Sequence, residues 1–89
     1  MKTVVITGST RGIGYGLAEA FIDRGCAVLV SGRSQAGVDT AVESLKAKSP
    51  DAQIVGCPCD VTDLSQLELL WTTASEHFDS VDIWINNIL

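Results

Sequence analysis

The sequence predicts an α/β protein with a doubly wound parallel sheet. Four short apolar runs have the composition of buried strands, and three segments with apolar residues at helical spacing separate them. The connections are short, and alternation of strand and helix favours parallel strands covered by helices on both faces. With 89 residues and no linker, repeat or low-complexity stretch, we expect one small domain over residues 1–89.

The first predicted strand and helix enclose a glycine-rich turn. The uncharged, β-branched run Val4–Ile6 predicts a buried strand. A helix is expected from Ile13 onward, and Asp23–Gly25 ends it with a charged turn and a glycine stop. The apolar stripe of this helix, at i, i+4, i+7 and i+8, consists of Ile13, Leu17, Ala20 and Phe21.

The middle of the chain continues the alternation. Ala27–Val30 predicts a second buried strand, and Ser31–Ser34 forms the loop after it. A second helix ends before Ser49-Pro50, because the residue before a proline avoids helical backbone. Its apolar stripe consists of Val38, Ala41, Val42 and Leu45. Gln53–Cys57 predicts a third strand, whose lower apolar content places it near an edge of the sheet.

The last helix and strand complete the predicted sheet. Asp63 is expected to cap a third helix, and Val81–Asn86 predicts the fourth strand. The apolar stripe of this helix consists of Leu64, Leu67, Trp71, Ala74 and Phe78. Right-handed crossovers and the Rossmann-like order 3-2-1-4 put the first two helices on one face and the third on the other. A ligand crevice is expected where the order reverses, at the carboxyl ends of the first and fourth strands.

The glycine-rich turn lies at that crevice. Its sequence is Thr7-Gly8-Ser9-Thr10-Arg11-Gly12-Ile13-Gly14, between the first strand and the first helix. Backbone N–H groups and the positive end of a helix dipole make such a turn an anion site. The glycines permit unusual backbone angles, close approach of a phosphate and close packing of helix on sheet. The turn is not a Walker A loop, because no Gly-Lys-Ser/Thr follows it.

The end of the second strand indicates which dinucleotide binds. Folds that prefer NAD carry Asp or Glu there, which holds the ribose 2′-OH. Here the corresponding residue is Gly32, and Arg33 and Ser34 follow it. A guanidinium binds a phosphate through two parallel hydrogen bonds, and Arg11 projects from the glycine turn toward the same place. We therefore expect NADP(H), with NAD(H) disfavoured.

The pattern T-G-x-x-x-G-x-G resembles the cofactor loop of the short-chain dehydrogenase/reductase family. The resemblance spans nearly the whole chain but only the N-terminal, cofactor-binding part of the family's fold. It implies that Asp60 and Val61 contact the adenine and that Asn86 and Asn87 shape the floor beneath the ribose. The stretches 4–12 and 81–87 are also similar to chlorophyll(ide) b reductase-like members. The residues expected to bind the cofactor are therefore Thr7, Gly8, Ser9, Thr10, Arg11, Gly12, Ile13, Gly14, Arg33, Ser34, Asp60, Val61, Asn86 and Asn87.

Two features depart from the family's pattern. Ile88 and Leu89 stand where the family has Ala and Gly, and the leucine side chain is expected to collide with the cofactor's sugar. The family's catalytic Tyr-x-x-x-Lys is absent, since the one tyrosine, Tyr15, is followed four residues later by Glu19. No catalytic residue is assigned, and we expect the isolated chain to be catalytically incompetent.

The expected function is NADP(H) binding within an oxidoreductase that transfers hydride between nicotinamide and a carbonyl or alcohol. The alternative is a non-catalytic nucleotide-binding or assembly module that pairs through its fourth strand. A thiol redox protein using Cys57 and Cys59 is a third interpretation, but C-x-C lacks the usual redox spacing, so packed, reduced thiols are favoured.

Composition limits the partners. The net charge is −5 with no basic cluster, which disfavours nucleic acid and anionic membranes, and no metal site is indicated. No apolar run is long enough to span a membrane, and no signal peptide precedes the first strand, so a cytoplasmic protein is expected. The fourth strand leaves an open apolar edge, which predicts a homo-oligomer or pairing with a missing C-terminal half.

Overall fold

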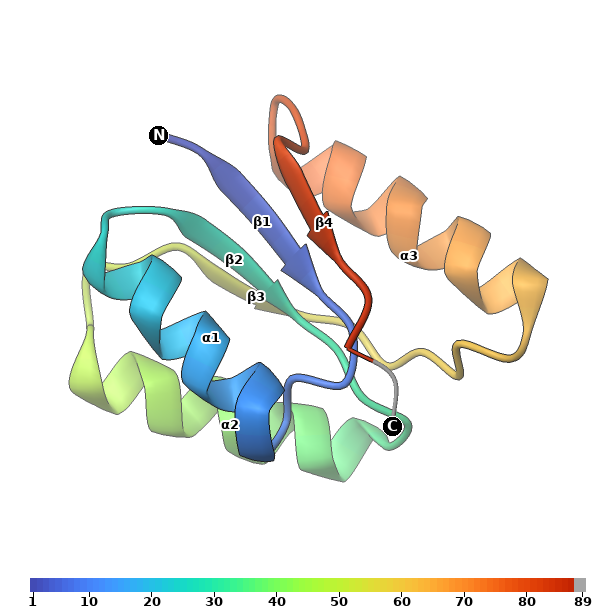
Figure 1. Cartoon of the computed structure of the whole chain (residues 1–89), viewed down its shortest axis with the longest axis horizontal. Coiled ribbons are helices and arrows are strands. Elements are labelled where there is room, and N and C mark those ends of the chain that lie inside the picture. Colours follow the sequence, from blue (N-terminus) through green and yellow to red (C-terminus); the bar gives the residue numbers. More distant parts are fainter. Residues whose placement is uncertain (88–89) are drawn as a thin grey trace.

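The computed structural model describes residues 1–87 and has four strands and three helices in strict alternation (Figure 1). The expectations for Ile88 and Leu89 lie outside the described residues. The elements are β1 (Thr3–Ile6), α1 (Gly12–Asp23), β2 (Ala27–Val30), α2 (Gln35–Lys48), β3 (Ile54–Gly56), α3 (Leu64–His77) and β4 (Ile83–Ile85). Each predicted element is present, although β3 and β4 are shorter than the predicted runs 53–57 and 81–86.

The four strands form one parallel sheet in the order β3-β2-β1-β4, as the sequence predicts. In β1 the central residue Val5 lies opposite Leu29 of β2 and Trp84 of β4. The predicted edge position of β3 is confirmed, and β4 occupies the opposite edge. All strands point the same way, so their carboxyl ends meet at one end of the sheet.

Helices α1 and α2 cover one face of the sheet and α3 covers the other (Figure 1). The residues of β1 and β2 are buried on both faces, which explains their unbroken apolar runs. The core on the side of α1 and α2 consists of Val4, Ile6, Ala18, Ile22, Val28, Val30, Ala41, Leu45 and Ile54. The core on the side of α3 consists of Val5, Ala27, Leu29, Cys57, Cys59, Leu70, Ala74 and Phe78.

The predicted helix boundaries have a clear physical basis. Helix α1 stops at Asp23, and Gly25 after it has φ +82°, the left-handed conformation that glycine adopts most readily. The side chain of Asp63 accepts hydrogen bonds from the backbone N–H groups of Ser65 and Gln66 and so caps α3. Hydrogen bonds from Ser65, then from Gln66, hold the pKa of Asp63 below its usual value.

The predicted apolar stripe of α1 is partly wrong. Ile13 is 71% exposed and Ala20 is exposed, whereas Leu17 and Phe21 are half-buried. The face against the sheet instead consists of Gly14, Ala18 and Ile22. Small residues bring the helix close to the sheet, but they contribute little to an apolar pattern, so the larger side chains one position away dominate the periodicity.

The predicted stripe of α3 also needs correction. Leu64 is 71% exposed and Trp71 is 54% exposed, whereas Leu70, which the predicted stripe leaves out, is fully buried. Ala74 is fully buried, as predicted. Leu67 is half-buried and Phe78 is buried, as the spacing predicts. The helix is apolar around much of its circumference, so spacing alone does not distinguish its inner face from its outer one.

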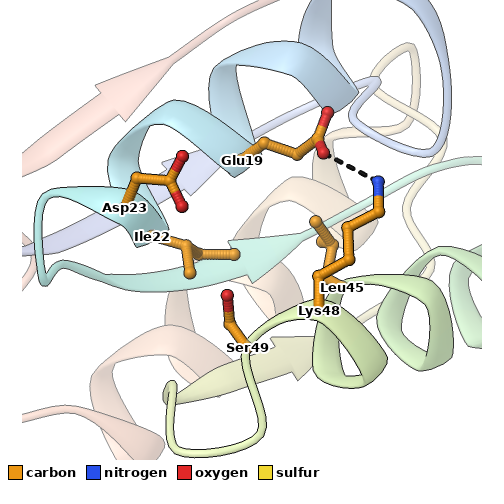
Figure 2. Close-up of a pocket in the computed structure, with 6 residues that line it drawn as sticks. All are labelled: Glu19, Ile22, Asp23, Leu45, Lys48 and Ser49. Atoms are coloured by element: carbon orange, nitrogen blue, oxygen red, sulfur yellow. Dashed lines mark hydrogen bonds and ion pairs between the residues drawn. The ribbon is translucent and has the colours of Figure 1, made fainter.

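Helices α1 and α2 are joined at the surface by an ion pair between Glu19 Oε2 and Lys48 Nζ, 2.8 Å apart (Figure 2). Figure 2 also shows the cavity beside this pair, lined by Glu19, Ile22, Asp23, Leu45, Lys48 and Ser49. Its volume of about 20 Å³ accommodates roughly one water molecule. This cavity is therefore too small for a cofactor or metabolite.

Candidate functional site

A cleft of about 960 Å³ opens at the carboxyl ends of the strands, where the sequence predicts the ligand crevice. It lies between the turn that leads into α1 and the loop that leads into α2. Its lining residues are Gly8, Thr10, Arg11, Gly12, Ile13, Gly32, Arg33, Ser34, Ala36, Gly37, Thr40, Cys59, Val61 and Asn87. Its volume lies in the range of small-molecule and cofactor sites.

Three glycines shape the turn between β1 and α1. Gly8 and Gly12 have φ of +60° and +64°, a conformation that other residues rarely adopt. Position 14 has no room for a side chain, because a Cβ there would lie 2.3 Å from the carbonyl oxygen of Gly8 and 2.7 Å from Nδ2 of Asn87. The turn is therefore held tightly against the first turn of α1 and the end of β4.

The side chains of Thr7 and Ser9 are fully buried and serve the turn itself. Thr7 Oγ1 accepts a hydrogen bond from the backbone N–H of Asn87 at 3.0 Å. Ser9 Oγ donates to the carbonyl of Ile6 at 2.7 Å and accepts from the N–H of Ser31 at 2.9 Å. These two residues of the predicted set link β1 to the ends of β4 and β2.

The N-terminus of α1 faces the cleft without a capping side chain, whereas Ser34 caps α2 and Asp63 caps α3. At the α1 N-cap, Arg11 makes no side-chain capping bond, and the first turn of α1 carries no acidic residue. The first N–H groups of a helix have no partner within the helix and carry partial positive charge. This end of α1 is therefore suited to bind an anion such as a phosphate.

Two guanidiniums flank the same cleft. Arg11 and Arg33 both line it and are both exposed. Among residues 1–87 the one ion pair joins Glu19 to Lys48, so neither arginine forms an ion pair with a carboxylate of this part of the chain. The position at the end of β2 where NAD-binding folds have an acid is Gly32. The cleft thus combines two positive charges with the absence of that carboxylate.

Of the remaining predicted residues, two line the cleft and two make hydrogen bonds outside it. Val61 and Asn87 line the cleft, and Asn87 Nδ2 donates to the carbonyl of Gly8 at 3.0 Å. The carboxylate of Asp60 instead accepts from the hydroxyl and N–H of Thr62, which lower its pKa, with a smaller contribution from Arg33. The side chain of Asn86 accepts from Trp84 Nε1 at 2.8 Å and does not line the cleft.

Five lining residues were not among those expected to bind the cofactor: Gly32, named only as the position without an acid, and Ala36, Gly37, Thr40 and Cys59. Ala36, Gly37 and Thr40 belong to the first turns of α2, and Thr40 follows Ala36 by four residues and Gly37 by three, so it shares a helix face with both. Their position directly after the Ser34 cap is the signal that could have identified them.

Cys59 was expected only as a packed thiol, and burial does raise the pKa of its thiol. All three cysteines are free thiols, and Cys57 and Cys59 are buried, as predicted.

Three further observations concern residues outside the cleft. Tyr15 is bonded to Ser44 at 2.7 Å and to Lys48 at 3.4 Å, between α1 and α2, and does not line the cleft. No group of His, Cys, Asp and Glu within residues 1–87 could hold a metal ion. No helix among the described residues is long and apolar enough to cross a membrane.

Comparison with known proteins gives the same family throughout. The family model described as short chain dehydrogenase matches residues 2–88. A 3alpha-hydroxysteroid dehydrogenase of Mediterraneibacter gnavus is 41% identical over 86 residues, which cover 97% of this chain and 34% of that protein. Chlorophyll(ide) b reductase NOL of Arabidopsis thaliana is 42% identical over 84 residues, which cover 94% of this chain and 24% of that protein.

A solved structure also matches the fold of this chain. The crystal structure of L-sorbose reductase from Gluconobacter frateurii, complexed with NADPH and L-sorbose, superposes with a TM-score of 0.92 at 30% identity. The match covers 99% of this chain and 33% of that one. The chain thus spans about a quarter to a third of the length of these three proteins.

Proposed function

The chain belongs to the short-chain dehydrogenase family, and on that premise we propose that it is the NADP(H)-binding part of an oxidoreductase. The observation that carries the proposal is the cleft in which Arg11 and Arg33 flank an uncapped helix N-terminus. The 30% identical L-sorbose reductase, whose structure contains NADPH, supports this choice of nucleotide.

The residues of the cleft fit the chemistry of NADP(H). Backbone N–H groups of the turn between Gly8 and Gly14 and the N-terminus of α1 would hold the pyrophosphate. Arg11 and Arg33 would hold the 2′-phosphate, and Val61 would contact the adenine. When bound, the nicotinamide supplies or accepts a hydride, and we propose a carbonyl or alcohol as the substrate of the whole enzyme.

The acid–base residues of that reaction are proposed to lie outside these 89 residues. The sequence has no Tyr-x-x-x-Lys, and its one tyrosine, Tyr15, does not line the cleft. The role proposed for residues 1–89 is therefore to bind and orient the cofactor.

Titration of the chain with NADPH and with NADH tests the proposal. Arg33→Ala is expected to raise the Kd for NADPH about tenfold, because one charge-assisted hydrogen bond contributes at least about 1.5 kcal/mol. The Kd for NADH should change little. Arg24→Ala is the matched control, since Arg24 is an equally charged, exposed residue at the C-cap of α1, outside the cleft. Equal affinities of the unaltered chain for NADPH and NADH would refute the 2′-phosphate assignment.

We also propose that β4 is covered in the functional protein, by a second copy of this chain or by a following part of a longer polypeptide. Strand β4 pairs with β1 alone, and its residues Ile83, Trp84 and Ile85 are only half-buried. An open apolar edge is a template for strand pairing. Sedimentation of the chain at increasing concentration separates the two arrangements, because a monomer at tens of micromolar excludes the first.

A further inference from the structure

Position 32 has no room for a side chain, which explains why a glycine is found there. Among the described glycines, positive φ occurs at Gly8, Gly12 and Gly25 but not at Gly32, so its backbone is open to any residue. A Cβ at Gly32 would, however, lie 2.6 Å from Cγ2 and 3.2 Å from Oγ1 of Thr10. The side chain of Thr10 therefore occupies the space that a side chain at position 32 would need.

This contact belongs to a series of contacts between the turn after β1 and the loop after β2. The N–H of Ser9 donates to the carbonyl of Ser31 at 2.8 Å, and the N–H of Ser31 donates to Ser9 Oγ at 2.9 Å. Thr10 and Gly32 follow next, and both line the cleft. Arg11 and Arg33, one residue further along each segment, flank the same cleft. Separation of the two segments at Gly32 would therefore also displace the guanidiniums.

We infer that Thr10 is a specificity-determining residue, whose side chain excludes from position 32 the carboxylate that would hold the free 2′-hydroxyl of NAD(H). The inference rests on the proposed nucleotide-binding function. A carboxylate at this position binds the ribose 2′-OH in NAD-dependent folds and repels a 2′-phosphate. In this chain the two arginines attract the phosphate, and Thr10 blocks the competing residue.

The geometry identifies the atoms responsible. Carbon atoms in contact are about 3.5–4.0 Å apart, so 2.6 Å requires that one side moves. Thr10 is β-branched and stiff at χ1, and both of its γ atoms are within 3.2 Å of the added carbon. Its Cβ lies 3.5 Å away, which is an ordinary contact. Thr10→Ala would remove the two obstructing atoms and keep the tolerated one.

The contact is tested without ligand by thermal unfolding of Gly32→Ala, Thr10→Ala and the double variant. Gly32→Ala is expected to lower the Tm by roughly 4–8 °C, as an overpacked site does in a domain of this size. The double variant is expected to recover most of that loss. Gly16→Ala is the matched control, because a Cβ at Gly16 meets nothing within 4 Å, and it should not lower the Tm.

The specificity is tested by titrating Gly32→Asp and Thr10→Ala/Gly32→Asp with NADPH and with NADH. Gly32→Asp alone is expected to weaken NADPH binding without a gain in NADH binding. The double variant is expected to bind NADH about tenfold more tightly than Gly32→Asp does. Should Gly32→Asp not fold, restoration of folding by Thr10→Ala supports the inference, and the alanine series measures the same contact.

Three results would overturn the inference. The first is a Gly32→Ala variant that melts at or above the temperature of the unaltered chain. The second is a double variant that recovers none of the lost stability. The third is Gly32→Asp gaining NADH affinity as fully as the double variant does. Failure of the unaltered chain to bind either nucleotide would refute the proposed function and the specificity claim together, whereas the ligand-free melting series would still measure the contact.

Discussion

Gly14→Ala is expected to destabilise the chain because the turn at the cleft is packed against Gly14. The added methyl group would lie 2.3 Å from the carbonyl oxygen of Gly8, 2.7 Å from Nδ2 of Asn87 and 2.9 Å from Cα of Ser9. Two of these atoms are backbone, so relief requires movement of the turn away from α1. Overpacking of this kind costs about 1–3 kcal/mol. Loss of the Asn87–Gly8 hydrogen bond adds about 1 kcal/mol.

Helix propensity acts in the opposite direction, since alanine is favoured over glycine by about 1 kcal/mol within a helix. The expected net loss is therefore about 2 kcal/mol, which lowers the Tm of a domain of this size by roughly 8–16 °C. Gly16→Ala, two residues further along the same helix, is the control. A Cβ at Gly16 meets nothing within 4 Å, so only the propensity gain of about 0.5–1 kcal/mol remains.

Thermal unfolding followed by far-UV circular dichroism measures both variants under one set of conditions. The expected result is a pair of opposite shifts, downward for Gly14→Ala and upward for Gly16→Ala. Shifts of the same sign would show that the turn yields to the methyl group without cost. The argument for close packing at Gly14 would then be wrong.

Three further predictions concern hydrogen bonds. Asp63→Ala is expected to lower the Tm because α3 loses its cap. Since folding lowers the pKa of Asp63, the carboxylate stabilises the folded chain above pH about 3.8, and this contribution declines as the pH falls further. Thermal melts of the unaltered chain and the variant at a series of pH values measure it. The buried hydroxyl of Ser31 has no partner within residues 1–87, so Ser31→Ala should melt at or above the unaltered chain, whereas Ser9→Ala should melt lower. Urea unfolding should show Asn87→Ala losing about 1 kcal/mol, since its amide bonds to the turn, and Asn86→Ala losing less; equal losses would contradict the difference in their roles.

The arrangement of the elements follows from features that the sequence states directly. Unbroken β-branched runs, helical spacing and short connections predict a parallel sheet, and the structure confirms the order β3-β2-β1-β4. Strands buried on both faces must be apolar throughout, so β1 and β2 are unambiguous. The place of the cleft then follows, because the order reverses beside β1.

The inner faces of the helices were less predictable because burial does not depend on hydrophobicity alone. In α1 the buried face includes two small residues, Gly14, which lies against the turn after β1 and Asn87, and Ala18, which packs in the core. In α3, the large side chains of Leu64 and Trp71 lie on the exposed side. An apolar periodic pattern reflects only the hydrophobicity of each residue, whereas close packing against a sheet also requires small side chains.

Within the glycine-rich turn, the sequence predicts membership of the site but not the direction of each side chain. Thr7 and Ser9 are fully buried, whereas Gly8 and Thr10 line the cleft. This alternation arises in a turn and not in a continued strand, because Gly8 has φ +60°, the left-handed conformation. The turn therefore separates residues that hold it together from residues that line the cleft. It also brings Thr10 to the side of the cleft where it meets Gly32.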